Sequence, residues 1–243
     1  MEKNENEDLT LLALNSIKRL LFYNEIVPVR LSSRELAKQL NMSPTPVTQA
    51  LKLLNYQGIL GHVPNKGYFV ETNSPEMIRD IFNLRIALET AGLSALPDRM
   101  TQANRDALEQ AVRDHMAALD LDAPKRVLMA DMAFHLKLSR ISGGEAGERL
   151  MQNLFEMLYL KSRDVVLYVS PRRDFGSHHR EILDALGQGD VALAQKILSG
   201  HLASVRDVIL QGMASHRANM GLDWDPPVSG RNSGRKSAGG FKD

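Results

Sequence analysis

The stretch 31–70 constrains the fold more than any other, because it carries two helix N-termini on either side of a short turn. Ser32, with Glu35 three residues later, forms a capping box and predicts the start of one helix. Ser43 followed by Pro44 predicts the start of another, since serine is a preferred N-cap and proline is tolerated at the first helical position. Two short helices this close together predict a helix-turn-helix unit.

A β-hairpin is predicted directly after the second helix. Gly58 ends that helix, because glycine readily takes the left-handed conformation found at helix C-termini. The segments 59–62 and 68–71 are expected to be strands, and Gly67 between them permits the positive φ of a tight turn with Lys66 near its tip. A hairpin in this position is a wing. The stretch therefore predicts a winged helix-turn-helix, which places its second helix in the major groove of DNA; a protein-binding module of the same shape is the alternative.

The local charge agrees with DNA as the partner of this domain, which we expect to span 8–72. Residues 27–70 contain five lysines and arginines against one glutamate, although the whole chain has a formal net charge of only +1. Such a local excess suits a surface that faces phosphates. The residues expected to contact double-stranded DNA are Arg34, Ser43, Thr45, Thr48, Gln49, Lys52, Lys66 and Gly67.

Composition narrows the class of protein. The 243 residues include no cysteine, which excludes disulfides and thiolate metal sites, so any metal must bind histidine or carboxylate side chains. The first residues are acidic and polar, and no apolar run approaches the roughly 20 residues that span a bilayer. We therefore expect a cytoplasmic protein with no membrane partner.

The chain from 75 to 213 is predicted to be all-helical, because apolar residues recur at helical spacing and no strand pattern is present. The expected fold is mostly α: a winged helix-turn-helix followed by an all-α antiparallel bundle of six to seven helices. Residues 214–243, rich in Gly, Ser, Asn and Pro, are expected to form a disordered tail. The expected helices of the bundle are 76–96, 102–120, 123–141, 146–169, 176–187 and 190–213.

Side chains on three of these helices form a candidate metal site. Asp131 and His135 are four residues apart, so they project from one face of their helix. His179 and His201 lie on the last two predicted helices. One carboxylate oxygen and three imidazoles suit Zn²⁺, Ni²⁺ or Mn²⁺. Spacing does not show that separate helices converge, so a surface or core role for each histidine is the alternative, and His115 has no evident partner.

The N-terminal domain resembles the DNA-binding domain of the GntR family of bacterial transcription regulators. Two departures fall on the recognition helix: Pro44 stands where the family has an arginine, and Thr48-Gln49 replaces an Arg-Glu pair. Arginine bonds guanine bidentately, whereas glutamine suits adenine and threonine suits a thymine methyl or a phosphate, so we expect an operator unlike the family's common one. The matching segments are Leu31-Ser32, Glu35-Leu36-Ala37, Leu40, Ser43, Thr45-Pro46-Val47, Ala50-Leu51, Leu54, Gly58-Ile59 and Pro64-Asn65-Lys66-Gly67.

The helical part is similar to the FCD effector domain, which follows such DNA-binding modules in the FadR subfamily. The resemblance implies that the Asp and three His hold a divalent metal, with zinc as the first expectation, and that a small carboxylate effector binds beside it. It also selects His179 over the adjacent His178. The matching segments are Leu84-Arg85-Ile86-Ala87-Leu88-Glu89, Asp131-Met132-Ala133-Phe134-His135, His179 before Ile182-Leu183-Asp184-Ala185-Leu186, Gly189-Asp190 and His201-Leu202.

The same resemblance implies the effector contacts. Arg85 matches the family arginine and is a natural clamp, since a guanidinium group binds a carboxylate bidentately. Arg163, on the fourth predicted helix, is a second candidate, for which a surface salt bridge is an equal alternative.

Together these features predict a ligand-responsive regulator, of the repressor type, that binds a pseudo-palindromic operator as a homodimer, because two-fold protein symmetry asks for two-fold DNA. The rival predictions are a metal-dependent hydrolase whose site activates water and a protein-interaction module with a winged-helix appendage. No carboxylate in the spacing is an evident general base, and a hydrolase would leave the DNA-binding module unexplained. We therefore expect no enzymatic activity.

Overall fold

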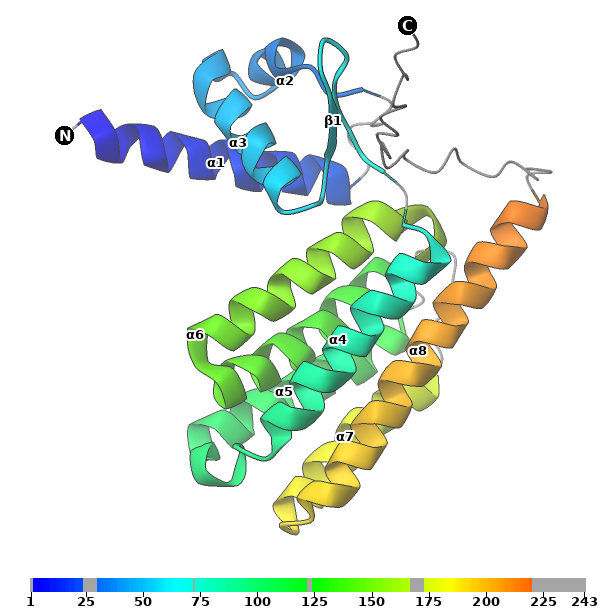
Figure 1. Cartoon of the computed structure of the whole chain (residues 1–243). Coiled ribbons are helices and arrows are strands. Elements are labelled where there is room, and N and C mark those ends of the chain that lie inside the picture. Colours follow the sequence, from blue (N-terminus) through cyan, green and yellow to red (C-terminus); the bar gives the residue numbers. More distant parts are fainter. Residues whose placement is uncertain (1, 24–29, 72, 122–123, 167–172, 220–243) are drawn as a thin grey trace, which may run out of the picture.

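The computed structural model describes residues 2–23, 30–71, 73–121, 124–166 and 173–219. Figure 1 shows a small N-terminal domain, which carries the β-hairpin, above a bundle of long helices. Within the described ranges no helix is both long and apolar enough to cross a membrane.

The N-terminal domain is a winged helix-turn-helix, as the sequence predicts. Its elements are α1 (Glu2–Phe22), α2 (Ser33–Gln39), α3 (Pro44–Tyr56), β1 (Gly61–Val63) and β2 (Gly67–Phe69). Helices α1 and α2 both pack on α3, and the antiparallel strands form the wing beside them (Figure 1). The predicted inner face of α3 is fully buried, namely Val47, Ala50, Leu51 and Leu54.

Both strands of the wing are shorter than predicted; the first begins two residues later and the second one residue earlier. Ile59 and Leu60, assigned to a strand by their sequence, lie instead in the turn that follows α3. Their N–H groups bond the carbonyl oxygen of Leu54 at 3.0 and 3.2 Å, and both side chains are buried in the domain core. The predicted strands 59–62 and 68–71 are therefore corrected to the observed bounds. Apolar residues after a helix fit either role, and the backbone hydrogen bonds decide between them.

The two short helices begin differently. Ser32 caps α2 as predicted, because its hydroxyl oxygen accepts a hydrogen bond from the N–H of Glu35 at 3.5 Å. Ser43 occupies the N-cap position of α3, but its side chain makes no capping hydrogen bond. The N-cap side chain usually bonds the second or third helical N–H. The third residue, Pro46, has none, and the remaining candidate, the N–H of Thr45, does not bond the Ser43 side chain either. Gly58 follows α3 with φ of +72°, the left-handed conformation expected after a helix.

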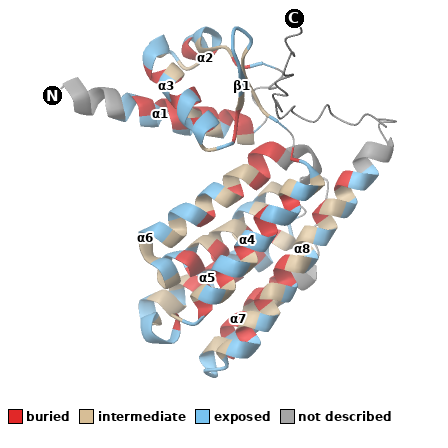
Figure 2. Cartoon of the chain, viewed as in Figure 1, coloured by how far each residue is buried: buried red, intermediate tan, exposed pale blue. Residues whose placement is uncertain are grey.

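The second domain is an all-α bundle, also as predicted. Its elements are α4 (Pro75–Leu93), the 3₁₀ turn η1 (Pro97–Arg99), α5 (Gln102–Leu119), α6 (Pro124–Val166), α7 (Arg173–Gly187) and α8 (Val191–Asn219). Each helix contributes buried apolar side chains to one continuous core, which Figure 2 shows as the red faces that point inward.

Helix α6 is assigned as one helical run, whereas the sequence predicts two helices, 123–141 and 146–169. The chain still reverses where the break is predicted. Gly144 has φ of +64°, and a Cβ on Gly147 would lie only 2.7 Å from the carbonyl oxygen of Ser139. Figure 1 shows the two antiparallel legs. We call residues 124–143 the first leg and residues 144–166 the second leg.

Helix α8 continues beyond residue 213, where the sequence predicts its end. Residues 214–219, assigned by sequence to the tail, are helical. Their sequence contains neither glycine nor proline, so nothing in its composition opposes continuation of the helix. The remainder of the predicted tail, 220–243, lies outside the described residues.

The second leg of α6 joins the bundle to the N-terminal domain. Leu160 is buried in the apolar core of the winged helix-turn-helix. Glu156 forms an ion pair with Lys18 of α1 at 2.7 Å. Lys161 Nζ donates a hydrogen bond to the carbonyl oxygen of Gly58, at the end of α3, over 3.2 Å. One helical segment therefore contacts the core, α1 and the end of the recognition helix.

This contact predicts that Leu160→Ala destabilises the N-terminal domain. Removing a fully packed leucine costs about 2–5 kcal/mol, because the cavity it leaves only partly closes. Urea unfolding monitored by circular dichroism measures the loss. The matched control is Leu150→Ala on the same leg, whose side chain is 53% exposed and should change the stability by less than about 0.5 kcal/mol. Equal effects of the two substitutions would contradict the packing described.

Candidate metal centre and nucleic-acid interface

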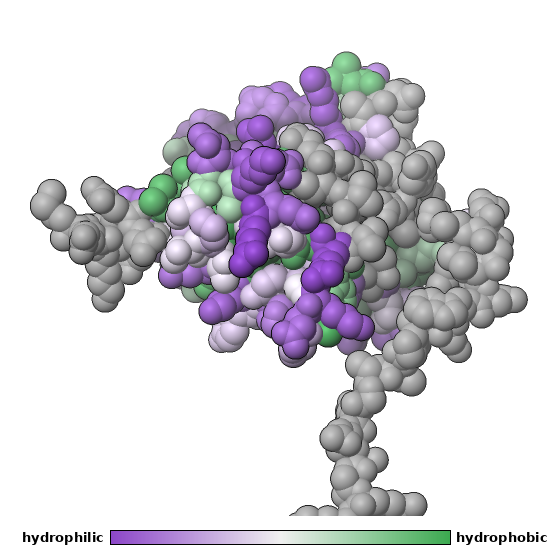
Figure 3. Space-filling model, turned by 90° about the horizontal axis from the view of Figure 1, so that it is seen from above, coloured by the Kyte–Doolittle hydropathy of each residue, from purple (hydrophilic) through white to green (hydrophobic). Residues whose placement is uncertain are grey.

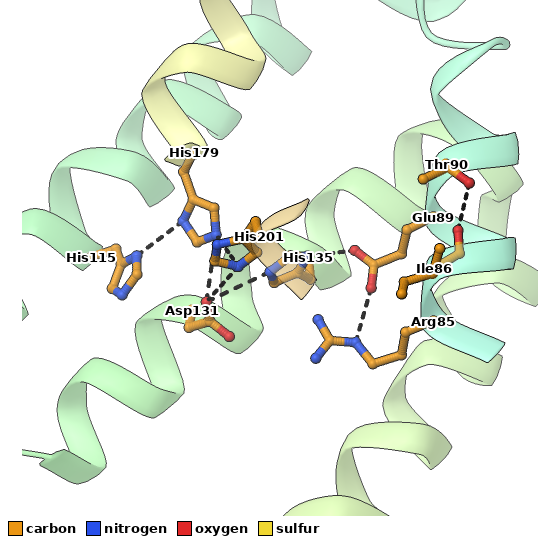
Figure 4. A network of polar contacts seen from close by, with 9 residues as sticks. All are labelled: Arg85, Ile86, Glu89, Thr90, His115, Asp131, His135, His179 and His201. Atoms are coloured by element: carbon orange, nitrogen blue, oxygen red, sulfur yellow. Dashed lines mark hydrogen bonds and ion pairs between the residues drawn. The ribbon is translucent and has the colours of Figure 1, made fainter. Parts of the chain in front are cut away.

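The bundle brings the four predicted metal ligands together. Asp131 and His135 come from the first leg of α6, His179 from α7 and His201 from α8, and all four are buried. Their candidate ligand atoms lie within 4.8 Å of one another. Asp131 Oδ1 lies 3.6, 3.5 and 3.7 Å from the Nε2 atoms of the three histidines in that order (Figure 4). The sequence supplies the residue types, and helix packing supplies the convergence.

Local geometry explains which histidine of the adjacent pair on α7 takes part. His179 is fully buried and faces the other ligand atoms, whereas His178 is half-buried. The ring of His179 stacks on Phe134 with centroids 4.1 Å apart, which holds its plane. Its Nε2 lies 3.3 Å from that of His201.

The donor set fits a divalent cation. Three imidazole Nε2 atoms and one carboxylate oxygen converge in an apolar interior, the combination that binds zinc and similar ions. His135 Nε2 is buried, points into this group and makes no hydrogen bond within the described structure. A buried polar atom without a hydrogen-bond partner is unfavourable, and a bound cation would supply the missing interaction.

The electrostatics favour the metal-binding protonation states. Burial lowers the pKa of His201 to about 4, despite the opposing Asp131 carboxylate. Burial and the nearby imidazoles also hold the pKa of His179 well below its usual range. Burial alone would raise the pKa of Asp131, but the surrounding histidines outweigh it and hold that pKa well below its usual range. Neutral imidazoles and an ionised carboxylate are the forms that ligate metals.

His135 differs from the other two histidines because a second carboxylate lies behind it. Its Nδ1 is hydrogen-bonded to Glu89 Oε2. Burial would lower the pKa of His135, yet Glu89 and Asp131 outweigh burial and raise it. Burial would likewise raise the pKa of Glu89, but His135 and then Arg85 lower it.

A further histidine contacts the group from outside. His115 of α5 is buried, and its Nδ1 lies 3.0 Å from Nδ1 of His179, so the two share one hydrogen (Figure 4). From the sequence alone, His115 has no evident partner and Glu89 has no evident role. The i,i+4 spacing of Arg85 and Glu89 on α4 was the available signal for the latter, because such residues meet on one helix face.

Arg85 is the other unusual group of the bundle, because its side chain is 0% exposed. Its Nε donates a hydrogen bond to Glu89 Oε1 at 2.9 Å, and its guanidinium carbon lies 4.3 Å from the ring centroid of Phe155. Nη1 and Nη2 are buried and make no hydrogen bond within the described structure. Charged donors left in this state are costly, so the arrangement favours an anion as their partner. The side chain of the second predicted clamp, Arg163, lies outside the described residues.

The predicted DNA-contacting residues lie on α2, α3 and the wing. Arg34, Ser43, Thr45, Gln49, Lys52 and Lys66 are exposed, while Thr48 and Gly67 are half-buried. Figure 3, seen from above the N-terminal domain, shows hydrophilic side chains over most of the described part of this face. Arg30, which is not among the residues predicted to contact DNA, is also exposed, and its Nη2 donates a hydrogen bond to the carbonyl oxygen of Asn65 in the wing turn at 3.4 Å.

Two residues of the recognition helix already have hydrogen-bond partners within the domain. Thr48 donates its hydroxyl hydrogen to the carbonyl oxygen of Pro44 at 2.8 Å. Gln49 Oε1 accepts a hydrogen bond from the hydroxyl of Thr10, on α1, at 2.7 Å. Thr45 and Lys52 are exposed on the same helix.

Comparison with known proteins agrees with this architecture. Residues 80–204 match the FCD domain family. A Streptomyces ambofaciens protein described as an uncharacterized HTH-type transcriptional regulator in an unstable DNA locus is 33% identical over 196 residues, covering 79% of this chain and 81% of the relative. The structure of Escherichia coli McbR/YncC superposes with a TM-score of 0.75 at 21% identity, covering 84% of this chain and 98% of that one. A transcriptional regulator GntR from Rhodococcus sp. RHA1 gives 0.69 at 20% identity, with 83% and 97% covered.

The fold and the relatives define a class: a winged helix-turn-helix regulator with an all-helical second domain. The chain belongs to the GntR family of transcription regulators and carries an FCD domain. The matched proteins are regulators and not enzymes, so the hydrolase prediction is rejected and the expectation of a non-enzymatic protein is confirmed.

The pKa shifts predict that the metal-free protein loses stability as the pH falls from 7 towards 5. The unfolded chain takes up a proton on His201 near the ordinary pKa of 6.5, whereas the folded state resists until about 4. Between these values the unfolded state binds more protons, so stability falls at up to about 1.4 kcal/mol per pH unit for each such histidine. His179 acts in the same direction. His135, whose pKa is raised, has the opposite sign.

Urea unfolding in the presence of a chelator, repeated across this pH range, measures the slope. The variant His201→Asn cannot take up the proton, so it should show a smaller slope. A metal-free wild-type protein that becomes more stable on acidification would contradict the electrostatics described.

Proposed function

We propose that this protein is a repressor, of the FadR subfamily, that binds a divalent metal and a small organic acid in its helical domain and releases DNA when the acid binds. The observation that most supports this proposal is that buried nitrogen atoms on either side of Glu89 make no hydrogen bond within the described structure. Among the described residues, Nη1 and Nη2 of Arg85 have no hydrogen-bond acceptor on one side, and His135 Nε2 has no hydrogen-bond partner on the other. An anion and a cation are the ligands that these groups need.

The metal would be held by the Asp131 carboxylate and the Nε2 atoms of His135, His179 and His201. Zinc is the first candidate for three imidazoles and one carboxylate, and nickel or manganese is also compatible. A bound divalent ion supplies a positive charge and open coordination positions for an anionic ligand. The protein contributes a buried and nearly rigid set of donors.

The effector would be a small carboxylate held by Arg85. The terminal nitrogens of a guanidinium group match the two oxygens of a carboxylate, and the contacts of Arg85 with Glu89 and Phe155 fix its plane before the ligand arrives. Pre-organisation of this kind lowers the entropy lost on binding. Because the guanidinium group of Arg85 is buried in the packed core of the bundle, we propose a small acid and not a large one as its ligand.

On the DNA side, we propose that a homodimer binds a pseudo-palindromic operator through α3 and the wing, within the cytoplasm. Lys52, Lys66 and Arg34 would meet phosphates. With Oε1 of Gln49 engaged by Thr10, the amide N–H groups are the ones left to face bases, which favours acceptor atoms on base edges. The relatives of this chain are described as HTH-type transcriptional regulators, which favours DNA over a protein as the partner of this face. A protein-interaction module is therefore the less well supported alternative.

The metal proposal predicts that protein purified with Zn²⁺ retains about one equivalent after gel filtration. His201→Ala should retain almost none, because the substitution removes one of the four donor atoms and leaves an incomplete set of ligands. Plasma mass spectrometry of the purified protein measures the content. His178→Ala is the matched control, since it removes a neighbouring histidine outside the ligand set and should leave the content unchanged. Equal metal content in the two variants would refute the site.

The DNA proposal predicts that the protein retards the promoter DNA of its own operon in a gel shift at low salt. A carboxylate that stabilises the protein in a thermal-shift screen should weaken this binding by about 5- to 150-fold, the usual range of allosteric coupling. Lys52→Ala should weaken DNA binding and reduce the salt dependence by about one unit of slope. Lys137→Ala, an exposed lysine on the first leg of α6, is the control and should change neither.

Arg85→Lys separates the two functions of the protein. It keeps the positive charge beside Glu89 but loses the bidentate fork, so DNA binding should persist while the response to the acid is lost. If the promoter DNA is not retarded even at low salt, the proposal that the protein binds this DNA is refuted. Retardation that no acid alters would refute the effector proposal alone.

A further inference from the structure

One carboxylate stands between the proposed effector clamp and the proposed metal ligands. Glu89 is 3% exposed, and both its oxygens are engaged. Oε1 accepts the Nε hydrogen of Arg85 at 2.9 Å, and Oε2 is hydrogen-bonded to His135 Nδ1. Figure 4 shows the Glu89 carboxylate lying between the two side chains. Glu89 therefore touches a metal-ligand candidate from behind and is not itself among the convergent donors.

This contact settles which nitrogen of His135 carries hydrogen. A neutral imidazole has one N–H and one lone pair, and an ionised carboxylate can only accept. The hydrogen must therefore be on Nδ1, which leaves the lone pair on Nε2, the atom that faces Asp131 and the other imidazoles. A hydrogen on Nε2 would point into the ligand group and exclude a cation from it.

Arg85 holds Glu89 in the orientation that this requires. The two residues are one turn apart on α4, and their ion pair is fully buried. Because Nε of Arg85 occupies Oε1, the second oxygen is directed at His135. The arrangement is a fixed series of contacts from clamp to ligand, made only of groups from α4 and the first leg of α6.

We propose that Glu89 is a positioning residue of the metal site: anchored through one oxygen by Arg85, it holds His135 through the other in the tautomer whose Nε2 binds a cation. The proposal rests on the metal binding of the proposed function. It also makes the metal site sensitive to the clamp, since any ligand that moves Arg85 also moves the carboxylate that orients His135. Outer groups of this kind affect metal affinity although they never touch the metal.

The substitution Glu89→Gln tests the proposal with almost no change of shape. The amide oxygen must serve the Nε hydrogen of Arg85, which needs an acceptor, so the amide NH₂ then faces His135 Nδ1. A donor in that place favours the tautomer with hydrogen on Nε2 and opposes metal binding. The Kd for Zn²⁺, measured by competition with a chromophoric chelator, should rise by about 10- to 100-fold.

Glu156→Gln is the matched control. It makes the same chemical change in a glutamate whose side chain is 11% exposed and whose ion pair is with Lys18 of α1, not with Arg85 or His135. It should leave the Kd for Zn²⁺ unchanged. If the wild-type protein binds no Zn²⁺, the metal proposal itself fails. If the wild type binds and Glu89→Gln binds equally well, only the role of Glu89 is refuted.

A measurement on the wild-type protein keeps the proposal testable if Glu89→Gln does not fold. Nitrogen-15 chemical shifts distinguish the two tautomers of a neutral imidazole. In metal-free protein, at a pH where His135 is neutral, its shifts should report hydrogen on Nδ1. A resonance pattern with hydrogen on Nε2 would overturn the proposal without any variant.

Discussion

The helical domain depends on a row of polar and charged side chains that are buried away from water. The row runs through the apolar core as three successive polar contacts, Arg85 with Glu89, Glu89 with His135, and His135 with Asp131. Removing one member of such a row leaves its neighbour buried without compensation, which commonly costs several kcal/mol. Within the described part of the chain, the terminal guanidinium nitrogens of Arg85 and Nε2 of His135 make no hydrogen bond. On our proposal, an anion beside Arg85 and a cation beside His135 would supply the missing interactions.

The second leg of α6 connects this row to the DNA-binding domain. Phe155 lies under the guanidinium of Arg85, and one residue later Glu156 pairs with α1. One turn further on, Leu160 enters the core of the winged helix-turn-helix and Lys161 bonds a carbonyl at the end of α3. A packed helix moves as a unit, so on our proposal a ligand that displaced Phe155 would also displace these contacts. The change in DNA affinity would then be limited to the difference in the ligand's affinity for the two arrangements.

Local rules predicted the parts of this protein whose interactions are local. The capping box at Ser32, the end of α3 at Gly58 and the shared helix face of Asp131 and His135 all follow from spacing within one element. The role of Glu89 could not be predicted in this way, because its partner His135 is on another helix. Likewise the missing cap at Ser43 depends on the geometry around a proline, and resemblance supplied the pairing of separate helices at the metal site.

Helix α1 contacts both the recognition helix α3 and the second leg of α6. The hydroxyl of Thr10, near the start of the buried face of α1, bonds Gln49 on the DNA-facing helix. Two turns further along α1, Lys18 pairs with Glu156 of the second leg. Helix α1 packs along α3 and also contacts the second leg of α6, so on our proposal a shift of that leg would reach the Gln49 amide through α1. Thr48, which bonds the backbone of its own helix, lacks this dependence. On our proposal that Gln49 faces bases, its contact with Thr10 links that part of DNA recognition to the helical domain.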